Sequence, residues 1–243
     1  MRLALIGYGK MGKEIEILAQ QRGHEIVCIV DSKNPIETAD FSNVQVAIEF
    51  TKPALAIHHI EFCLKNQIPI VVGTTGWVDQ LDFIREKVAF FNGSLLHASN
   101  FSIGVNIFFE INRKLAELMN PHAKDYQLSM EEIHHTQKLD APSGTAISLA
   151  KDIIAASDYE QWNCIENTNA VPMSHFPEFD IHAKRIPDIP GTHIVTYSSE
   201  IDTIEIKHEA KNRKGFALGS ILASEWLIGK TGIFTMQNVL NIS

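Results

Sequence analysis

The sequence predicts an α/β protein of two domains: a parallel sheet covered by helices, then an α+β domain with a mixed, largely antiparallel sheet. Three observations predict this fold. In residues 1–101, short apolar runs alternate with helix-forming segments, which is the pattern of a parallel sheet. Residues 102–213 contain runs in which apolar and polar residues alternate, as in antiparallel strands. The apolar segment 215–232 predicts a last helix that returns to pack on the first domain.

Composition and charge limit the possible functions. The chain has 243 residues, of which 45% are hydrophobic, and a formal net charge of -8. A nucleic-acid partner is not expected, because it requires a basic face. No run approaches the ~20 apolar residues of a membrane span, and the N-terminal run reaches Gly7 and Lys10 too early for a signal peptide. We therefore expect a cytoplasmic protein without a membrane partner. The cysteines lack C-x-x-C spacing and predict neither disulfides nor a zinc site.

The first elements predict a nucleotide site. Residues 2–6 form an apolar run that ends in a G-x-G-x-x-G loop, and a helix-forming segment, a second apolar run at residues 25–30 and Asp31 follow. This is the order of a Rossmann-type dinucleotide-binding unit, in which the glycines admit the pyrophosphate to a helix N-terminus and the acid accepts hydrogen bonds from a ribose. A purely structural glycine turn is the alternative. The predicted cofactor-binding residues are Gly7, Tyr8, Gly9, Lys10, Met11, Gly12 and Asp31.

The alternation of strands and helices continues to residue 100. Strands are predicted at 44–50, 68–73 and 94–100, with helices from Pro53 and over about 79–91. Ligands of such sheets bind at the loops that follow the strands. The Gly-Thr-Thr-Gly loop could bring backbone amides and hydroxyls to a nicotinamide, although a helix cap with turn glycines has the same sequence. His58 and His59 are interpreted as structural, because the pattern supplies no metal-ligand partner. The further cofactor candidates are Gly73, Thr74, Thr75, Ala98, Ser99, Asn100 and Phe101.

The middle of the chain predicts a substrate site. Residues 126–135 predict a strand in which His134 and His135 face opposite ways. The sequence Ser143-Gly144-Thr145 after Pro142 predicts a helix start, whose free N–H groups and two hydroxyls could bind a carboxylate or phosphate. Lys138 adds a cation, and Asp140 could orient it. The candidate site residues here are His134, His135, Lys138, Ser143, Gly144 and Thr145.

These groups suggest proton transfer to or from a bound anion. A histidine that titrates near neutrality would exchange the proton, while Lys138 and the helix start hold the substrate. The competing interpretation is an exposed histidine pair next to an ordinary helix start. No metal is predicted, because no cysteine or carboxylate at ligand spacing joins the two histidines. After Ala156 an irregular segment is expected up to residue 171, and the alternation in 171–199 and 202–210 predicts antiparallel strands.

Taken together, the motifs resemble the dihydrodipicolinate reductase family, the 4-hydroxy-tetrahydrodipicolinate reductases of bacterial lysine and diaminopimelate biosynthesis. The resemblance covers nearly the whole chain. It is carried by GYGKMG at 7–12, EFTKP at 49–53, GTTG at 73–76, ASNFSIGVN at 98–106 and, most specifically, H-H-x-x-K-x-D-A-P-S-G-T-A at 134–146.

The resemblance implies an oxidoreductase that reduces a cyclic imine dicarboxylate with NADH or NADPH and assembles as a homotetramer through the sheets of its second domain. It implies that residues 1–101 and 214–243 bind the dinucleotide and that residues 102–213 bind the substrate and form the oligomer. His134 would donate or accept the proton, and Lys138 would be a second donor or a substrate-binding cation. The substrate carboxylates would be contacted by His135, Ser143, Gly144 and Thr145.

One departure from the family affects the cofactor. Only residues 32–43 separate Asp31 from the next predicted strand, a shorter segment than many members have, so one wall of the adenine site is expected to be reduced. Asp31 favours a ribose diol over a 2′-phosphate, although Ser32 and Lys33 could offset this. We predict that NADH works at least as well as NADPH. Two other functions fit the same fold: a catalytically silent NAD-binding sensor or scaffold, and an oxidoreductase for another small acid.

Overall fold

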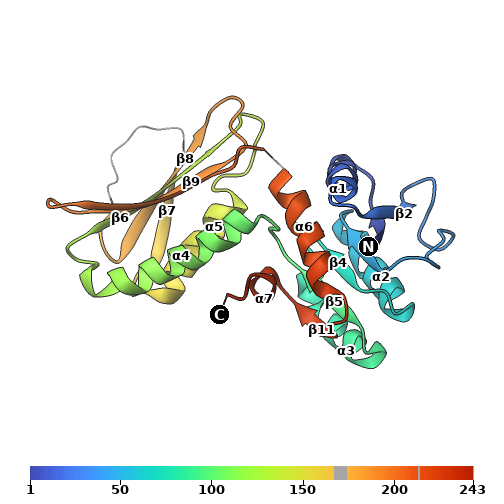
Figure 1. Cartoon of the computed structure of the whole chain (residues 1–243). Coiled ribbons are helices and arrows are strands. Elements are labelled where there is room, and N and C mark those ends of the chain that lie inside the picture. Colours follow the sequence, from blue (N-terminus) through green and yellow to red (C-terminus); the bar gives the residue numbers. More distant parts are fainter. Residues whose placement is uncertain (167–173, 213, 243) are drawn as a thin grey trace. The chain divides into compact units, whose positions relative to one another are not determined.

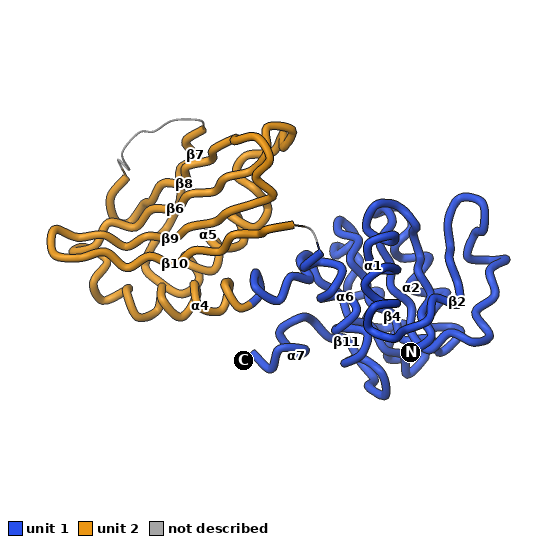
Figure 2. Tube along the Cα trace, turned by 45° about the horizontal axis from the view of Figure 1, so that its top comes forward, with its two compact units in different colours: residues 1–106, 214–243 blue, residues 107–213 orange. Residues whose placement is uncertain are grey.

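The computed structural model describes residues 1–166, 174–212 and 214–242. The chain divides into two compact units, one formed by Met1–Asn106 with Lys214–Ser243 and the other by Ile107–Arg213 (Figure 2). The first division falls inside helix α4 (Ile103–Met119), whereas the sequence places it just before that helix. Each unit has its own sheet and its own hydrophobic core.

Unit 1 is a six-stranded sheet in which every pairing is parallel, with the order β11-β5-β4-β3-β1-β2. The predicted parallel sheet with its helices is confirmed (Figure 1). Its strands β3 and β4 are buried along their whole length, which is why they are apolar apart from Glu49 at the end of β3. The strands are β1 (Arg2–Ile6), β2 (Glu25–Val30), β3 (Val46–Glu49), β4 (Ile70–Val72), β5 (Ser94–His97) and β11 (Gly232–Phe234).

Helices cover both faces of this sheet. Successive strand residues point to opposite faces, so Leu5 packs in a cluster with α1 and α6, while Ile6 packs in a cluster with α2 and α3. The carboxyl ends of the strands are left at one edge, where the loops after β1, β2, β3 and β4 begin. The helices are α1 (Lys10–Gln21), α2 (Pro53–Lys65), α3 (Leu81–Phe91), α6 (Lys214–Leu227) and α7 (Met236–Leu240), with a 3-10 turn η1 (Val78–Gln80) before α3.

The C-terminal segment differs from the prediction. The helix expected over 215–232 ends at Leu227, and β11 and α7 follow it. Gly229 has a φ of +76°, a left-handed conformation that is common just after a helix C-terminus. The apolar residues beyond it therefore continue as an edge strand beside β5.

Unit 2 is a five-stranded mixed sheet with the order β10-β9-β6-β8-β7. Strand β9 runs antiparallel to β6 and β10, whereas β8, which was also predicted to be antiparallel, runs parallel to β6 and β7. The alternation of side chains predicts the buried face of a strand but not its direction. Residues of α4 and α5 pack with one face of the sheet in a single core, and Figure 2 shows the strands side by side. The elements are β6 (Gln127–His134), β7 (Gln161–Glu166), β8 (Glu178–Arg185), β9 (Thr192–Ser198), β10 (Thr203–Glu209), α5 (Gly144–Ala156) and the 3-10 turn η2 (Asn120–His122).

Strand β7 was not predicted, since the segment after Ala156 was expected to be irregular. It is an edge strand paired only with β8 among the described strands, and its residues are exposed or half-buried. Gln161 and Asn163 are exposed while Trp162 and Cys164 between and after them are half-buried, but this alternation is at the shortest length that predicts a strand. The start of the predicted antiparallel segment, residues 171–173, lies outside the described residues.

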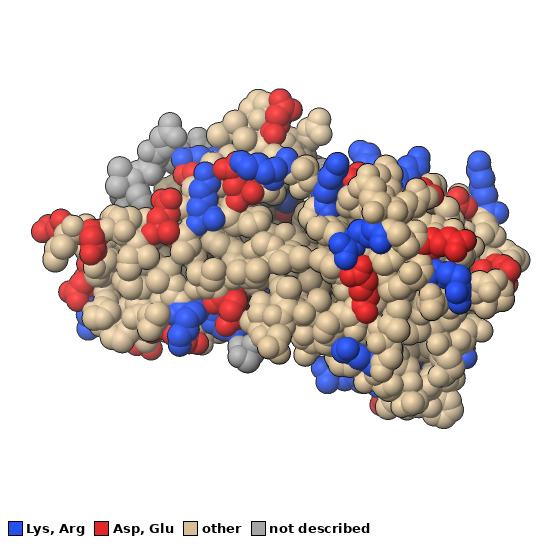
Figure 3. Space-filling model, viewed as in Figure 1, with Lys and Arg blue, Asp and Glu red and all other residues tan. Residues whose placement is uncertain are grey.

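The alternation predicted for β6 is confirmed. Leu128, Met130, Glu132 and His134 are buried, and the residues between them are half-buried. None of the described helices is long and apolar enough to cross a membrane. On the face shown in Figure 3, basic and acidic side chains are interspersed over both units.

Candidate functional site

The glycine loop of unit 1 has the geometry that its sequence predicts. Gly7 has a φ of +98°, and a Cβ there would lie 2.1 Å from the Phe50 carbonyl oxygen. A Cβ at Gly12 would lie 2.3 Å from the Gly7 carbonyl oxygen, so this glycine lets α1 pack closely on the loop. A Cβ at Gly9 would meet nothing within 4 Å. Gly9 also precedes α1 without a side-chain cap, which leaves the helix N-terminus open to an anion.

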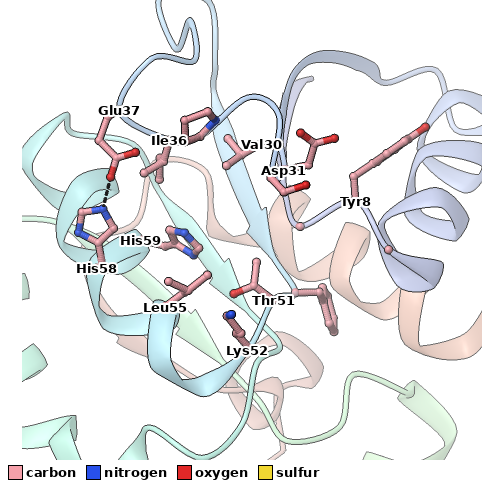
Figure 4. Close-up of a pocket in the computed structure, with 15 residues that line it drawn as sticks. Tyr8, Val30, Asp31, Ile36, Glu37, Thr51, Lys52, Leu55, His58 and His59 are labelled. Atoms are coloured by element: carbon pink, nitrogen blue, oxygen red, sulfur yellow. Dashed lines mark hydrogen bonds and ion pairs between the residues drawn. The ribbon is translucent and has the colours of Figure 1, made fainter.

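A cavity of about 700 Å³ lies beside this loop (Figure 4). Asp31 reaches it from the end of β2, and its Oδ1 accepts hydrogen bonds from the backbone N–H groups of Lys33 at 2.8 Å and Asn34 at 3.0 Å. These bonds fix the carboxylate at the cavity. The lining residues include Gly7, Tyr8, Gly9, Val30, Asp31, Ser32, Pro35, Ile36, Glu37, Phe50, Thr51, Lys52, Leu55, His58 and His59.

The opposite side of this cavity comes from α2 and was not identified from the sequence. Leu55, His58 and His59 share one face of the helix, at i, i+3 and i+4 spacing, and α2 starts at the carboxyl edge of the sheet. His58 Nε2 lies 2.7 Å from Glu37 Oε1 (Figure 4). A backbone hydrogen bond and the contact with His58 lower the pKa of Glu37 below its ordinary value. Glu37 therefore adds a second carboxylate near Asp31.

A second cavity, of about 350 Å³, joins the glycine loop to the Gly-Thr-Thr-Gly loop. The Thr74 hydroxyl accepts a hydrogen bond from the Thr51 N–H at 2.7 Å, and the Thr51 hydroxyl donates to Glu49. A Cβ at Gly73 would lie 2.1 Å from the Phe50 ring, so any larger residue there would require that ring to move. The Thr74 side chain therefore ties the Gly-Thr-Thr-Gly loop to the backbone of the loop after β3. The cavity is lined by Gly9, Lys10, Met11, Phe50, Thr51, Pro53, Gly73, Thr74 and Thr75.

The loop after β5 contributes to neither of these cavities: Ala98, Ser99, Asn100 and Phe101 are absent from both linings. Phe101 is buried in the core, where its ring centroid lies 5.8 Å from that of Phe50. Its carbonyl oxygen would lie 1.8 Å from a Cβ at Gly219. The structure therefore gives the Phe101 side chain a packing role.

In unit 2, His134 ends β6 and is held by a buried carboxylate. Its Nδ1 is hydrogen-bonded to Glu132, which is two residues earlier on the same face and has no exposed surface. Arg185 Nη1 donates to the other Glu132 oxygen at 3.0 Å. Burial alone raises the pKa of Glu132, but the hydrogen bonds and charges of His134 and Arg185 lower it overall. Glu132 is therefore ionised and can only accept, so Nδ1 of His134 carries the proton and Nε2 is left for exchange.

A second histidine lies beside the first. His193 is the second residue of β9 and lies opposite Glu132, and its ring centroid lies 5.1 Å from that of His134. Burial and, next, the neighbouring His134 lower the pKa of His193 to about 3, so His193 is neutral at physiological pH. A Cβ at Gly191 would lie 3.0 Å from His134 Nε2. The absence of a side chain at Gly191 therefore leaves space beside Nε2 of His134.

The start of α5 is joined to this pair. Ser143 Oγ lies 2.9 Å from His193 Nε2 and accepts a hydrogen bond from the Ala146 N–H at 3.1 Å. This bond confirms the predicted helix start, and it also uses one of the N–H groups that were expected to be free. Gly144 is exposed, with nothing within 4 Å of a Cβ, and Thr145 is half-buried.

Lys138 lies on the loop between β6 and α5. Its Nζ contacts the two Asp140 oxygens at 2.8 and 2.7 Å, and this lysine lowers the pKa of Asp140. Arg185 donates to the backbone oxygens of Lys138 at 3.3 Å and Asp140 at 2.7 Å. His135 is half-buried outside the buried row of β6, and its Nδ1 has no hydrogen-bond partner among the described residues. The structure thus brings together His134, Lys138 and Ser143.

Glu132, His134 and His193 also place three metal-ligating atoms within 4.8 Å of one another. The sequence predicted no metal, and it could not reveal this group because His193 comes from a distant strand. Arg185 already neutralises Glu132, and Ser143 already contacts His193. These contacts with Arg185 and Ser143 explain why Glu132, His134 and His193 lie close together, and no cation is needed to hold them.

Comparisons with known proteins agree with this architecture. The family model described as dihydrodipicolinate reductase, N-terminus, matches residues 1–101, and the model described as dihydrodipicolinate reductase, C-terminus, matches residues 104–240. A 4-hydroxy-tetrahydrodipicolinate reductase of Christiangramia forsetii is 48% identical over 99% of this chain and 98% of its own length. One from Thermosipho africanus is 33% identical, again over 99% and 98% of the two chains.

Solved structures support the fold. A dipicolinate-bound dihydrodipicolinate reductase from Paenisporosarcina sp. TG-14 matches with a TM-score of 0.76 and 23% identity, covering 97% of each chain. A probable dehydrogenase from Thermotoga maritima has a TM-score of 0.58 and 10% identity, covering 100% of this chain and 93% of its own. Since both family models match and together span almost all of the sequence, the chain belongs to the dihydrodipicolinate reductase family.

Proposed function

We propose that this protein reduces 4-hydroxy-tetrahydrodipicolinate to tetrahydrodipicolinate with NADH or NADPH, as a step of diaminopimelate and lysine biosynthesis. The family supplies the reaction, and the observation that carries its assignment to particular residues is the state of His134. Glu132 holds one ring nitrogen and the absence of a side chain at Gly191 leaves space at the other. A ring held in this way can take up a proton at Nε2, because the Glu132 carboxylate compensates the positive charge of the imidazolium, and can then deliver that proton from Nε2.

The residues of unit 1 fit a dinucleotide. The open N-terminus of α1, the space beside Gly9 and the fixed Asp31 carboxylate are what a pyrophosphate and a ribose diol require. When bound, the nicotinamide supplies the hydride. Asp31 would bind the ribose diol and Thr75 would contribute a hydroxyl. The other residues that would hold the cofactor are Gly7, Tyr8, Gly9, Lys10, Met11, Gly12, Gly73 and Thr74. Although they line neither cavity, the residues of the loop after β5 would reach the cofactor from the same edge of the sheet: Ala98, Ser99, Asn100 and Phe101.

The residues of unit 2 would bind and protonate the substrate. Lys138 would attract a substrate carboxylate or act as a second donor, and the start of α5 would hold carboxylates through Ser143, Gly144 and Thr145, with His135 beside them. His134 would protonate the carbon that becomes basic when hydride is added. We assign the dinucleotide to residues 1–101 and 214–243, and the substrate and the oligomer contacts to residues 102–213.

We also propose a cytoplasmic homotetramer that assembles through the sheets of unit 2. The outer strand β10 carries Ile204, which is 38% exposed, and Ile201 before it is 91% exposed. Adjacent exposed apolar side chains at this outer strand and the turn before it support association there. Light scattering of the purified protein tests the assembly.

The test of the activity is cofactor oxidation with the substrate made in the cuvette from pyruvate and aspartate semialdehyde by the preceding synthase. We expect oxidation that disappears when the synthase is omitted. Because Asp31 and Glu37 both line the cavity, we expect NADH to be at least as good as NADPH. A kcat/KM about tenfold higher with NADPH would contradict that preference. Cofactor binding without oxidation would instead indicate a silent sensor or scaffold.

A further inference from the structure

Arg185, the last residue of β8, is the most highly connected cation of unit 2 among the described contacts. Its side chain is 13% exposed. Nη1 donates to Glu132 at 3.0 Å and to the Lys184 backbone oxygen at 2.8 Å. Nη2 and Nε donate to the backbone oxygens of Asp140 and Lys138. A planar guanidinium with five N–H donors can serve these acceptors at once, whereas an ammonium group cannot.

One set of these bonds acts on His134. Glu132 shares its two oxygens between Arg185 and His134 Nδ1. The guanidinium therefore fixes the carboxylate, and the carboxylate fixes the rotation and the tautomer of the imidazole. The positive charge of the guanidinium also compensates the buried negative charge of Glu132, so that Glu132 stays ionised and accepts hydrogen bonds.

The other set acts on the loop that carries Lys138. The backbone oxygens of Lys138 and Asp140 are held by the guanidinium, and the side chains of the same two residues form an ion pair. The loop is therefore tied to the end of β8, beside His134, with which Arg185 is in register.

We propose that Arg185 is a positioning residue that fixes the proton-bearing His134, through Glu132, and the substrate-binding Lys138, through its loop, in one arrangement. This inference rests on the proposed reduction. It requires Arg185 to act on two separate steps: on kcat through His134, and on KM for the substrate through Lys138.

The test is Arg185→Lys, which keeps the positive charge but removes the planar guanidinium with its five N–H donors. We expect kcat to fall about tenfold or more and KM for the substrate to rise, with NADH affinity unchanged. In a His134→Gln background, the same change should alter kcat by less than about threefold and still raise KM, because residues that act through one another are not additive. Lys184→Arg is the matched control: it makes a similar exchange on the adjacent residue, which pairs with Glu131, and should leave both constants unchanged.

Equal losses of kcat in the two backgrounds would overturn the proposal, as would a variant within twofold of the parent enzyme in both constants. A second measurement does not depend on turnover. In ¹⁵N-histidine spectra, His134 should show the Nδ1–H tautomer in the parent protein and a mixture in Arg185→Lys, while Lys184→Arg matches the parent. Identical His134 spectra in all three proteins would refute the positioning role. If the parent protein lacks reductase activity, the proposed function fails, and the spectra alone decide the role of Arg185.

Discussion

Replacing Gly9 by alanine separates cofactor binding from folding. An added Cβ would meet no atom within 4 Å, and Gly9 has a φ of -83°, which alanine adopts without strain. Alanine reduces the entropy of the unfolded chain, which stabilises the fold by about 0.4–1 kcal/mol, but it is a poorer residue than glycine before a helix. We therefore expect the free energy of unfolding to change by less than about 1 kcal/mol.

The effect on binding should be much larger. The new methyl group would occupy the open space at the N-terminus of α1, where the pyrophosphate is proposed to approach the backbone. Loss of a hydrogen bond to a charged group costs about 1.5–3 kcal/mol. Since each 1.4 kcal/mol corresponds to a factor of ten, the Kd for NADH should rise roughly 10- to 100-fold.

Titration with NADH fluorescence and chemical denaturation provide the two readouts, and Gly23→Ala is the matched control. Gly23 also has nothing within 4 Å of a Cβ, but its φ is +78° and it lines neither cavity. This control should lose about 1 kcal/mol of stability, because a left-handed conformation strains alanine, and should keep the NADH affinity. A Gly9→Ala protein that binds NADH within about twofold of the parent would refute the assignment of the glycine loop to the pyrophosphate.

Three further predictions concern unit 2. His134→Gln should lower kcat by ~10²- to 10⁴-fold with unchanged NADH affinity if His134 transfers the proton, and steady-state kinetics showing a loss below about threefold would count against that role. Gly191→Ala would place a methyl group 3.0 Å from His134 Nε2, so kcat should fall roughly 10- to 100-fold; a kcat equal to that of the parent would mean that this side of the ring is not used. The pKa of His193 is lowered to about 3 from its ordinary 6.5, so as the pH falls below 6.5 the unfolded chain takes up a proton that the folded protein does not. Stability should therefore decrease toward pH 3 by up to about 1.4 kcal/mol per pH unit from this group, and His193→Asn should lack that component in denaturation measured across pH; equal slopes would show that His193 is not buried in its neutral form.

Local order along the chain made unit 1 predictable. The strand, the glycine loop, the helix and Asp31 follow one another directly, and the close contact that requires glycine at position 12 is made to Gly7, a few residues away. Sequence spacing alone therefore determines this geometry. The same holds for Ser143, whose side chain caps a helix that begins at the next residue.

Elements with only a weak local signal were missed. Strand β7 is a half-exposed edge strand, and β11 follows the apolar run that predicted a longer helix. Both exist because a neighbouring strand, β8 or β5, offers them hydrogen bonds. A partner of this kind is not visible in the amino-acid pattern of the strand itself.

The surroundings of His134 were decided by the tertiary structure. The sequence alone determined that His134 lies on the buried face of β6, because side chains alternate along a strand. Arg185 is 53 residues from Glu132, and His193 comes from yet another strand. They meet because the sheet register pairs His134 with Arg185 and Glu132 with His193. Register depends on the packing of the whole sheet against α4 and α5, so the sequence could propose His134 for proton transfer but could not identify the groups that contact its ring.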